Sequence, residues 1–199
     1  MSYLSIKRIL DVLFSLLLLI LLLPLLILVA LLIKLGSKGP VLFKQDRIGY
    51  RAQPFQMLKF RSMVQGAAQM GTGQYSFKGD PRVTRIGHII RMTSIDELPQ
   101  LINILKGDMS FIGPRPTLLF HPYPIEQFPE YALRRFSVRP GITGWAQVHG
   151  RKELPWEKRF EYDLEYVDRC SLALDFKIFL KTFGKLVSFS DNVNTGKTA

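Results

Sequence analysis

The sequence is poor in several features that define common classes of protein. It has a single cysteine, Cys170, so no disulfide can form within the chain, and this composition fits a reducing compartment. We expect Cys170 to be a small buried apolar residue. The three histidines, His88, His121 and His149, lie far apart without metal-ligand spacing, so no zinc site is indicated. The sequence contains no internal repeat and no low-complexity tract.

Acidic residues are also scarce. The chain has 16 Asp and Glu against 27 Lys and Arg, a net charge of +11. The imbalance is concentrated in residues 34–91, where eleven Lys or Arg face only Asp46 and Asp80. Such a basic surface attracts the phosphates of lipids, nucleotides or nucleic acids.

Charged residues are absent from residues 12–33, where only Ser15 and Pro24 interrupt an aliphatic run. A helix of this length, at about 1.5 Å per residue, reaches roughly 33 Å, about one hydrocarbon thickness. A soluble helix would carry a polar face, which this run lacks. A signal peptide is the alternative, but the run is too long and no small-residue cleavage pattern follows. The sequence therefore predicts a membrane helix over residues 1–35.

Pro24 predicts a kink in this helix, because proline removes one backbone hydrogen bond and clashes with the carbonyl four residues back. Two topologies remain open: a kinked helix that crosses the bilayer once, or a re-entrant helix with both ends on the cytoplasmic side. Basic residues flank both ends, Lys7 and Arg8 before the run and Lys34 and Lys38 after it. Because basic flanks favour the cytoplasm, they pull both ends to the same side.

The rest of the chain has room for one modest domain. Hydrophobic periodicity and turn residues predict an α+β fold, a compact helix-rich cytoplasmic domain with short strands, over residues 36–187, followed by a polar tail, 188–199. The predicted elements are a strand from residue 41, a strand or short helix at 54–63, a mobile loop at 65–81, a helix at 98–106 with Leu98, Leu101, Ile102 and Leu105 on one face, turn-rich loops at 113–116 and 139–144, and amphipathic helices at 156–168 and 174–187.

The acidic pair Asp96 and Glu97 is the most informative local feature. Ser94 and Glu97 have the spacing of a capping box, and Pro99 suits the first turn of a helix, so the pair is predicted at a helix N-terminus. Such acids can simply cap a helix and complement its dipole. However, Arg82, Arg85 and Arg91 supply more positive charge nearby than capping requires, and a helix N-terminus also binds phosphate.

Adjacent carboxylates have a specific use beside a diphosphate. One can hold a divalent cation while the other attacks phosphorus to give an acyl phosphate. The attack requires nearby cations, because nucleophile and target are both anionic. Arg115, between two prolines, and Arg139, in Arg-Pro-Gly-Ile-Thr-Gly, are candidates because guanidinium binds phosphate in a bidentate manner. Alternatively, Pro-Arg-Pro is only a surface turn. Lys59 and Arg61 can equally be solvated strand charges, which is the interpretation that these two residues alone favour.

The ordered motifs identify a family. The string Ser-Ile-Asp-Glu-Leu-Pro-Gln-Leu-Ile-Asn-Ile-Leu-Lys-Gly-Asp-Met-Ser-Phe-Ile-Gly-Pro-Arg-Pro at 94–116 closely resembles the bacterial sugar transferase family, the small monotopic phosphoglycosyl transferases. Blocks at 59–63, 138–151 and 160–163 match other motifs of that family. The likeness extends from the membrane segment to about residue 187, and this ordered set is very specific.

The resemblance implies a two-step reaction. The aspartate matching Asp96 attacks the phosphate of a UDP-sugar and releases UMP, and a polyprenol phosphate such as undecaprenol phosphate then accepts the sugar phosphate. The glutamate matching Glu97 helps to bind Mg²⁺, beside Asp96. The resemblance also implies a re-entrant helix and a location on the cytoplasmic face of the bacterial inner membrane, in contact with membrane lipids. The residues at matching substrate-binding positions are Lys59, Arg91, Arg115, Arg139, Arg151 and Asp163.

Two departures and two rival functions accompany this resemblance. The family's Ser-Pro pair in the membrane helix is Leu23-Pro24 here, and its usual Asn before Gly-Arg is His149. One rival function is a membrane-anchored module that binds anionic lipid or nucleic acid, and the other is a nucleotide-sugar diphosphatase that uses water as acceptor. A pure anion binder gains nothing from acids at its most basic point, so we expect no nucleic-acid partner.

Overall fold

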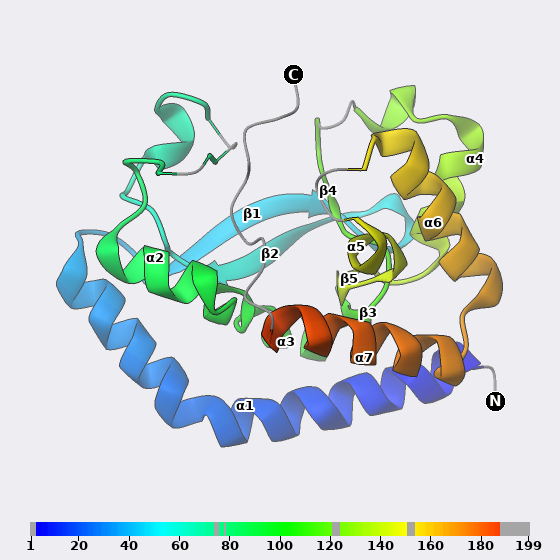
Figure 1. Ribbon diagram of the computed structural model, residues 1–199, viewed down its shortest axis with the longest axis horizontal. Coiled ribbons are helices and arrows are strands. Elements are labelled where there is room, and N and C mark those ends of the chain that lie inside the picture. Colours follow the sequence, from blue (N-terminus) through cyan, green and yellow to red (C-terminus); the bar gives the residue numbers. More distant parts are fainter. Residues whose placement is uncertain (1–2, 74–75, 78, 121–123, 151–153, 188–199) are drawn as a thin grey trace.

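The computed structural model describes residues 3–73, 76–77, 79–120, 124–150 and 154–187. A long N-terminal helix is followed by a helix-rich domain with short strands, which confirms the predicted mixed α and β fold (Figure 1). The helices of four or more residues are α1 (Tyr3–Gly36), α2 (Arg85–Met92), α3 (Gln100–Lys106), α4 (Glu130–Leu133), η5 (Arg134–Ser137), α5 (Trp145–His149), α6 (Trp156–Arg169) and α7 (Leu172–Val187). The short 3₁₀ turns are η1 (Tyr50–Ala52), η2 (Ala67–Gln69), η3 (Ile95–Glu97) and η4 (Ile125–Gln127).

Two small sheets organise the domain. Strand β1 (Leu42–Ile48) pairs antiparallel with β2 (Pro54–Phe60) along its whole length, and its other edge pairs with β4 (Thr117–Leu118). The second sheet pairs β3 (Ser110–Ile112) in parallel with β5 (Gly141–Thr143).

Strand β5 corrects one prediction, because residues 139–144 were expected to form only a turn-rich loop. A Cβ at Gly141 would lie 2.1 Å from the backbone nitrogen of Gly113. The two backbones can therefore approach this closely only because both residues are glycine.

Helix α1 is the apolar helix that the sequence predicts. Its most apolar window has a mean hydropathy of 3.5 with only 11% of it buried, so it is long and apolar enough to cross a membrane and unlike a soluble core helix. Pro24 lies inside the helix, and Figure 1 shows the helix bent in its central part as it runs along one side of the domain. The four buried residues of α1 are Asp11, Ser15, Val29 and Ile33.

The domain packs on α1 through two apolar clusters. The second half of α1 contributes Val29 and Ile33 to a cluster with Phe60 of β2 and Ile90 of α2. The first half packs through Leu18 and Leu19 against a cluster formed by Met57, Leu101, Ile104 and Met109. Strand β2 and helices α2 and α3 therefore lie directly on the apolar helix.

Helix α3 ends as predicted but buries a different face. Gly107 ends it in a left-handed conformation, with φ of 96°. The fully buried residues are Gln100, Leu101, Asn103 and Ile104, whereas Leu98, Ile102 and Leu105 of the predicted apolar face are only partly buried. The reason is a polar contact to β2: Asn103 accepts a hydrogen bond from the Leu58 amide at 2.9 Å and donates one to the Gln56 carbonyl at 2.8 Å.

Two other predictions are modified. The segment 65–81 was predicted as a mobile loop, but its described part contains η2 and is bound by Arg82, whose guanidinium donates to the carbonyls of Ala67 and Met70. Arg82 also forms an ion pair with Asp80 at 2.7 Å, so its positive charge is compensated within this segment. Cys170 is only partly buried, against an apolar cluster.

Candidate active site

The acidic pair lies on η3, a single 3₁₀ turn between α2 and α3. The predicted capping box is wrong: the side chain of Ser94 makes no capping hydrogen bond, and its backbone carbonyl accepts one from the Glu97 amide at 3.1 Å. The reason is local geometry, because Ser94 has a left-handed conformation with φ of 57°, whereas a capping serine is extended. Asp96 and Glu97 therefore precede α3 instead of starting it.

Two cations from distant segments contact Glu97. Lys59, at the end of β2, places Nζ 2.7 Å from Glu97 Oε1. Arg115, in the Pro-Arg-Pro loop between β3 and β4, places Nη2 3.7 Å from the same oxygen. The structure thus brings three of the predicted site residues together from separate parts of the chain.

The two neighbouring carboxylates have very different acidities. Burial raises the pKa of Asp96 to about 6, and the charge of Glu97 adds to this rise while Lys59 and Arg91 oppose it. Burial would also raise the pKa of Glu97, but Lys59 and Arg115 outweigh it and hold that pKa at about 2. Glu97 is therefore an anion at any physiological pH, whereas Asp96 titrates near neutrality. Arg91 acts on Asp96 through its charge.

Arg47 is a further cation of this site that the sequence analysis missed. Its guanidinium donates to Gln45 Oε1 at 2.6 Å and to the Pro116 carbonyl at 3.0 Å. Burial and repulsion by Arg115 lower its pKa to about 9, so it remains charged at neutral pH. Gln45 and Arg47 are two positions apart on the predicted strand, so their side chains lie on the same face. This spacing does not indicate the contact of Arg47 with the Pro-Arg-Pro loop.

Arg139 lies at the opposite end of α3. Its Nε donates to the Gly107 carbonyl at 2.8 Å, and its guanidinium stacks over the Tyr50 ring at 5.1 Å. Arg8 of α1 donates to the Leu105 carbonyl at 2.9 Å, so two guanidiniums bind carbonyls at the C-terminal end of this helix. A seven-residue helix is about 10 Å long, so Arg139 is well separated from the acidic pair. Its role in substrate binding stays a prediction.

Asp163 lies in the core, paired with Arg135. Arg135 Nη2 is 2.6 Å from Asp163 Oδ2, and both side chains are 2% exposed. Burial raises the pKa of Asp163, and Arg135 opposes this rise. Arg135 also donates to the backbone carbonyl of Arg115 at 2.8 Å, so the buried pair supports the loop that carries Arg115. The prediction that Asp163 binds substrate stays untested, and in this structure its side chain acts on the site through Arg135.

The last motif residues have separate outcomes. Arg151 lies outside the described residues. His149, which replaces the family's usual Asn, has Nδ1 2.8 Å from the Trp145 carbonyl and stacks on the Tyr162 ring at 4.7 Å between centroids. It therefore contacts residues of α5 and α6.

The acidic pair fits a magnesium ion shared with a substrate. Within the part of the chain that the structure describes, no group of three or more His, Cys, Asp or Glu could hold a metal ion. Mg²⁺ is usually bound by one or two carboxylates together with substrate phosphates, which matches Asp96 and Glu97. Glu97 would share its carboxylate between such a metal and the two cations Lys59 and Arg115, which contact Oε1. These donors suit Mg²⁺ only when a phosphate completes the site.

Carboxylates surrounded by excess positive charge suit phosphoryl chemistry, and comparisons with known proteins agree. Residues 2–189 match the family model described as bacterial sugar transferase. The chain is 41% identical over 182 residues to the uncharacterized sugar transferase EpsL of Bacillus subtilis, an alignment that covers 92% of this chain and 87% of that protein. The chain therefore belongs to the bacterial sugar transferase family and is an enzyme of the phosphoglycosyl transferase kind.

Two relatives have names that specify a reaction. The chain is 47% identical over 193 residues to the UDP-glucose:undecaprenyl-phosphate glucose-1-phosphate transferase of Caulobacter vibrioides, with 94% of this chain and 71% of that protein covered. It is 44% identical over 189 residues to the protein of the same name from Escherichia coli, with 92% of this chain covered. The alignment spans 40% of the length of the Escherichia coli relative.

Proposed function

We propose that this chain transfers a sugar phosphate from a UDP-sugar to undecaprenyl phosphate. The observation that carries the proposal is the position of Asp96 next to Glu97, where the charges of Lys59 and Arg91 act on Asp96 and those of Lys59, Arg115 and Arg47 act on Glu97. A nucleophilic carboxylate lies among cations that outnumber the acids, as attack on an anionic diphosphate requires. The named relatives support the same donor and acceptor.

In the first step, a carboxylate oxygen of Asp96 attacks the phosphorus that carries the sugar. An O–P bond forms, the bond from this phosphorus to the bridging oxygen of UMP breaks, and UMP leaves with the bonding electrons. Lys59, Arg115 and Arg47 neutralise the phosphate oxygens. Asp96 must be ionised for this attack.

In the second step, an oxygen of undecaprenyl phosphate attacks the same phosphorus. The new O–P bond forms as the bond to Asp96 breaks, which restores the carboxylate and gives undecaprenyl-diphosphate-sugar. Two separate steps let UMP leave before the second anion arrives, so the cations handle one anionic partner at a time.

Glu97 and Asp96 would hold Mg²⁺ together with the diphosphate. When bound, the metal offsets negative charge on the phosphate oxygens. Lys59 keeps Glu97 ionised and oriented through Oε1 for that purpose.

The position of α1 supports a re-entrant helix with the domain on the cytoplasmic face of the bacterial inner membrane. Both of its ends contact the same domain: Lys7 pairs with Asp175 at 2.6 Å, and Arg61 donates to the Ser37 carbonyl at 2.8 Å. A cysteine placed at Ser2, in a Cys170→Ser background, should resist an impermeant thiol reagent added outside intact cells. Labelling under those conditions would establish a spanning helix instead.

The reaction is tested with the wild-type enzyme and a panel of UDP-sugars that includes UDP-glucose and UDP-N-acetylgalactosamine. With a UDP-sugar alone, we expect up to one UMP per enzyme and a mass increase that maps to Asp96. UMP that appears only with both substrates indicates a single-displacement reaction. Continuous UMP release without lipid indicates a diphosphatase. No UMP under any of these conditions indicates a membrane-anchored binding module.

A further inference from the structure

The C-terminal end of α1 is fixed by one buried side chain, that of Arg61, which directly follows β2. Arg61 is 6% exposed and donates to the Lys38 carbonyl at 2.7 Å, the Ser37 carbonyl at 2.8 Å and Ser37 Oγ at 2.9 Å. A Cβ at Gly39 would lie 2.1 Å from Arg61 Nη1, so glycine at that position leaves room for the guanidinium. We call Arg61 and these partners the Arg61 anchor.

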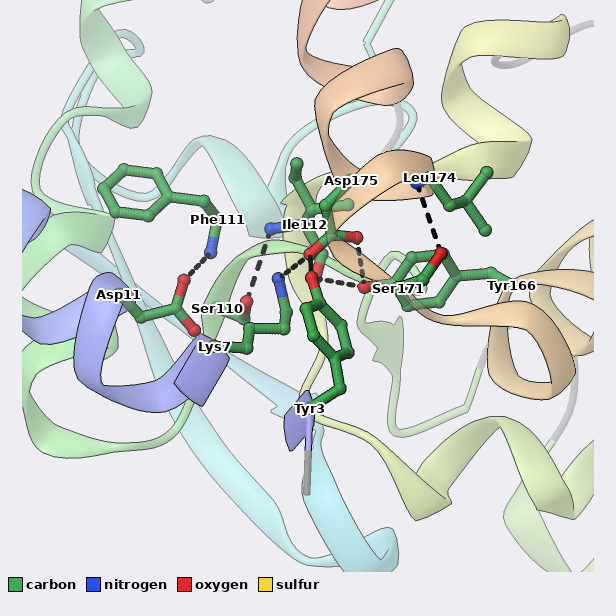
Figure 2. A network of polar contacts seen from close by, with 10 residues as sticks. All are labelled: Tyr3, Lys7, Asp11, Ser110, Phe111, Ile112, Tyr166, Ser171, Leu174 and Asp175. Atoms are coloured by element: carbon green, nitrogen blue, oxygen red, sulfur yellow. Dashed lines mark hydrogen bonds and ion pairs between the residues drawn. The ribbon is translucent and has the colours of Figure 1, made fainter. Parts of the chain in front are cut away.

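The N-terminal end of α1 is fixed by a second polar cluster. Figure 2 shows Tyr3, Lys7 and Tyr166 converging on the carboxylate of Asp175, at the start of α7. Lys7 lies 2.6 Å and Tyr166 2.8 Å from it, and the Tyr166 hydroxyl is also 3.2 Å from the Ile112 carbonyl of β3. We call these four side chains the Asp175 anchor. It ties α1 to β3, α6 and α7.

Between the anchors, α1 packs against the segments that carry the site. Phe60 and Ile95 both belong to the apolar cluster on the second half of α1. Phe60 directly follows Lys59 in the chain, and Ile95 directly precedes Asp96. Lys59 and Asp96 are therefore each one position away from a residue of the apolar cluster that the second half of α1 helps to form.

We infer that Arg61 and Asp175 are positioning residues that set the height of the membrane relative to Asp96. The inference rests on the proposed function. The bilayer follows α1, because most large apolar side chains of that helix are exposed. The phosphate of a polyprenol acceptor is confined to the headgroup plane, so its distance from Asp96 depends on how α1 is held. The nucleotide sugar arrives from water and does not depend on that distance.

The test compares kcat/KM for each substrate in Arg61→Met, Asp175→Asn and the wild type, all as full chains in lipid vesicles. Since misplacement by about 1 Å can cost 10²-fold, we expect kcat/KM for undecaprenyl phosphate to fall about tenfold or more. We expect kcat/KM for the UDP-sugar to stay within about twofold, because that step uses no membrane-borne group. Arg61→Lys should recover part of the loss, because it retains a cation for the carbonyls.

Two controls separate positioning from folding. Arg169→Met removes an exposed ion pair with Glu165 and should leave kcat/KM unchanged for both substrates. A short-chain, water-soluble prenyl phosphate should react equally with the wild type and the anchor variants, because it is not held in the headgroup plane. Equal losses for both substrates, or no loss for either, would overturn the inference. A wild-type enzyme that releases no UMP with any UDP-sugar would instead overturn the proposed function, and this inference with it.

Discussion

Glu97 and Asp163 are both acids from the family motifs, and both have a close cation, yet they lie in opposite environments. Glu97 is 2.7 Å from Lys59 and Asp163 is 2.6 Å from Arg135. The side chain of Glu97 is 24% exposed, whereas that of Asp163 is 2% exposed. The two ion-pair distances are nearly the same, so the pairs differ in solvent access and in the surrounding charge.

The two ion pairs therefore present different surroundings to an arriving ligand. Around Glu97, the cations outnumber the acids and remain partly accessible, so an arriving phosphate gains attraction without first breaking the existing contacts. Around Asp163, one buried cation matches one buried anion, and removal of either leaves an uncompensated charge. A motif identifies both acids equally, whereas the structure shows Glu97 partly accessible and Asp163 buried with Arg135.

Substitution of Asp96 tests the accessible cluster most directly. Asp96→Asn keeps the shape of the side chain but removes the nucleophile, so we expect transfer to fall by roughly 10³-fold or more. Radiolabelled sugar transfer to undecaprenyl phosphate provides the measurement, and circular dichroism checks that the fold is retained. A variant that keeps a substantial part of wild-type activity would show that Asp96 is not the nucleophile.

Glu97 should have the next largest effect on turnover. Glu97→Gln removes a metal ligand and the anion that holds Lys59, so we expect kcat to fall by roughly 10²-fold. The wild type in excess chelator should lose activity and regain it with Mg²⁺, as measured by UMP release. Full activity in chelator would contradict the metal role and leave Glu97 with an electrostatic function alone.

Asp163 should show the reverse pattern, a larger effect on stability than on binding. Asp163→Ala leaves Arg135 buried without its partner, so we expect a loss on the order of 3 kcal/mol in the free energy of unfolding. Lys59→Met breaks a more exposed pair and should cost about 1 kcal/mol or less. Thermal unfolding of both variants provides the comparison. If Asp163→Asn and Asp163→Ala unfold like the wild type but lose affinity for UDP-sugar, Asp163 binds substrate as the family motif predicts.

Features carried by local sequence were predictable. The aliphatic run predicts α1, Gly107 predicts the end of α3, and the ordered motifs mark Lys59, Glu97 and Arg115 as candidate site residues, which the structure brings into contact. These signals are strong because periodicity, turn residues and motif order need no knowledge of the tertiary structure.

Features that depend on distant contacts were not predictable. Arg47, Arg61 and Arg135 each bind backbone carbonyls more than 15 positions away, and no local pattern marks which carbonyl an arginine will reach. The parallel pairing of β3 with β5 joins strands too short to give an alternating pattern. The left-handed conformation of Ser94 overrides a spacing that otherwise indicates a capping box.

The smallest expected effect is a pH dependence that separates the two carboxylates of the accessible cluster. The pKa of Asp96 is raised to about 6, so its nucleophilic form is lost as pH falls through that value. The rate of UMP release with UDP-sugar alone should therefore be flat above pH 7 and fall about tenfold per unit below pH 6. Omitting the lipid is essential, because a phosphate monoester itself titrates near pH 6.

Two variants give this profile opposite shifts. Glu97→Gln removes a negative charge that raises the pKa of Asp96, so the midpoint should move to lower pH. Lys59→Met removes a positive charge that lowers the pKa of Asp96, so the midpoint should move to higher pH. Residual rates suffice, since only the midpoint is compared. Asp163 and Arg135 are not among the main charges that shift the pKa of Asp96, so Asp163→Asn should leave the midpoint in place. A midpoint that is the same in Glu97→Gln, Lys59→Met and the wild type would assign the titration to a group other than Asp96.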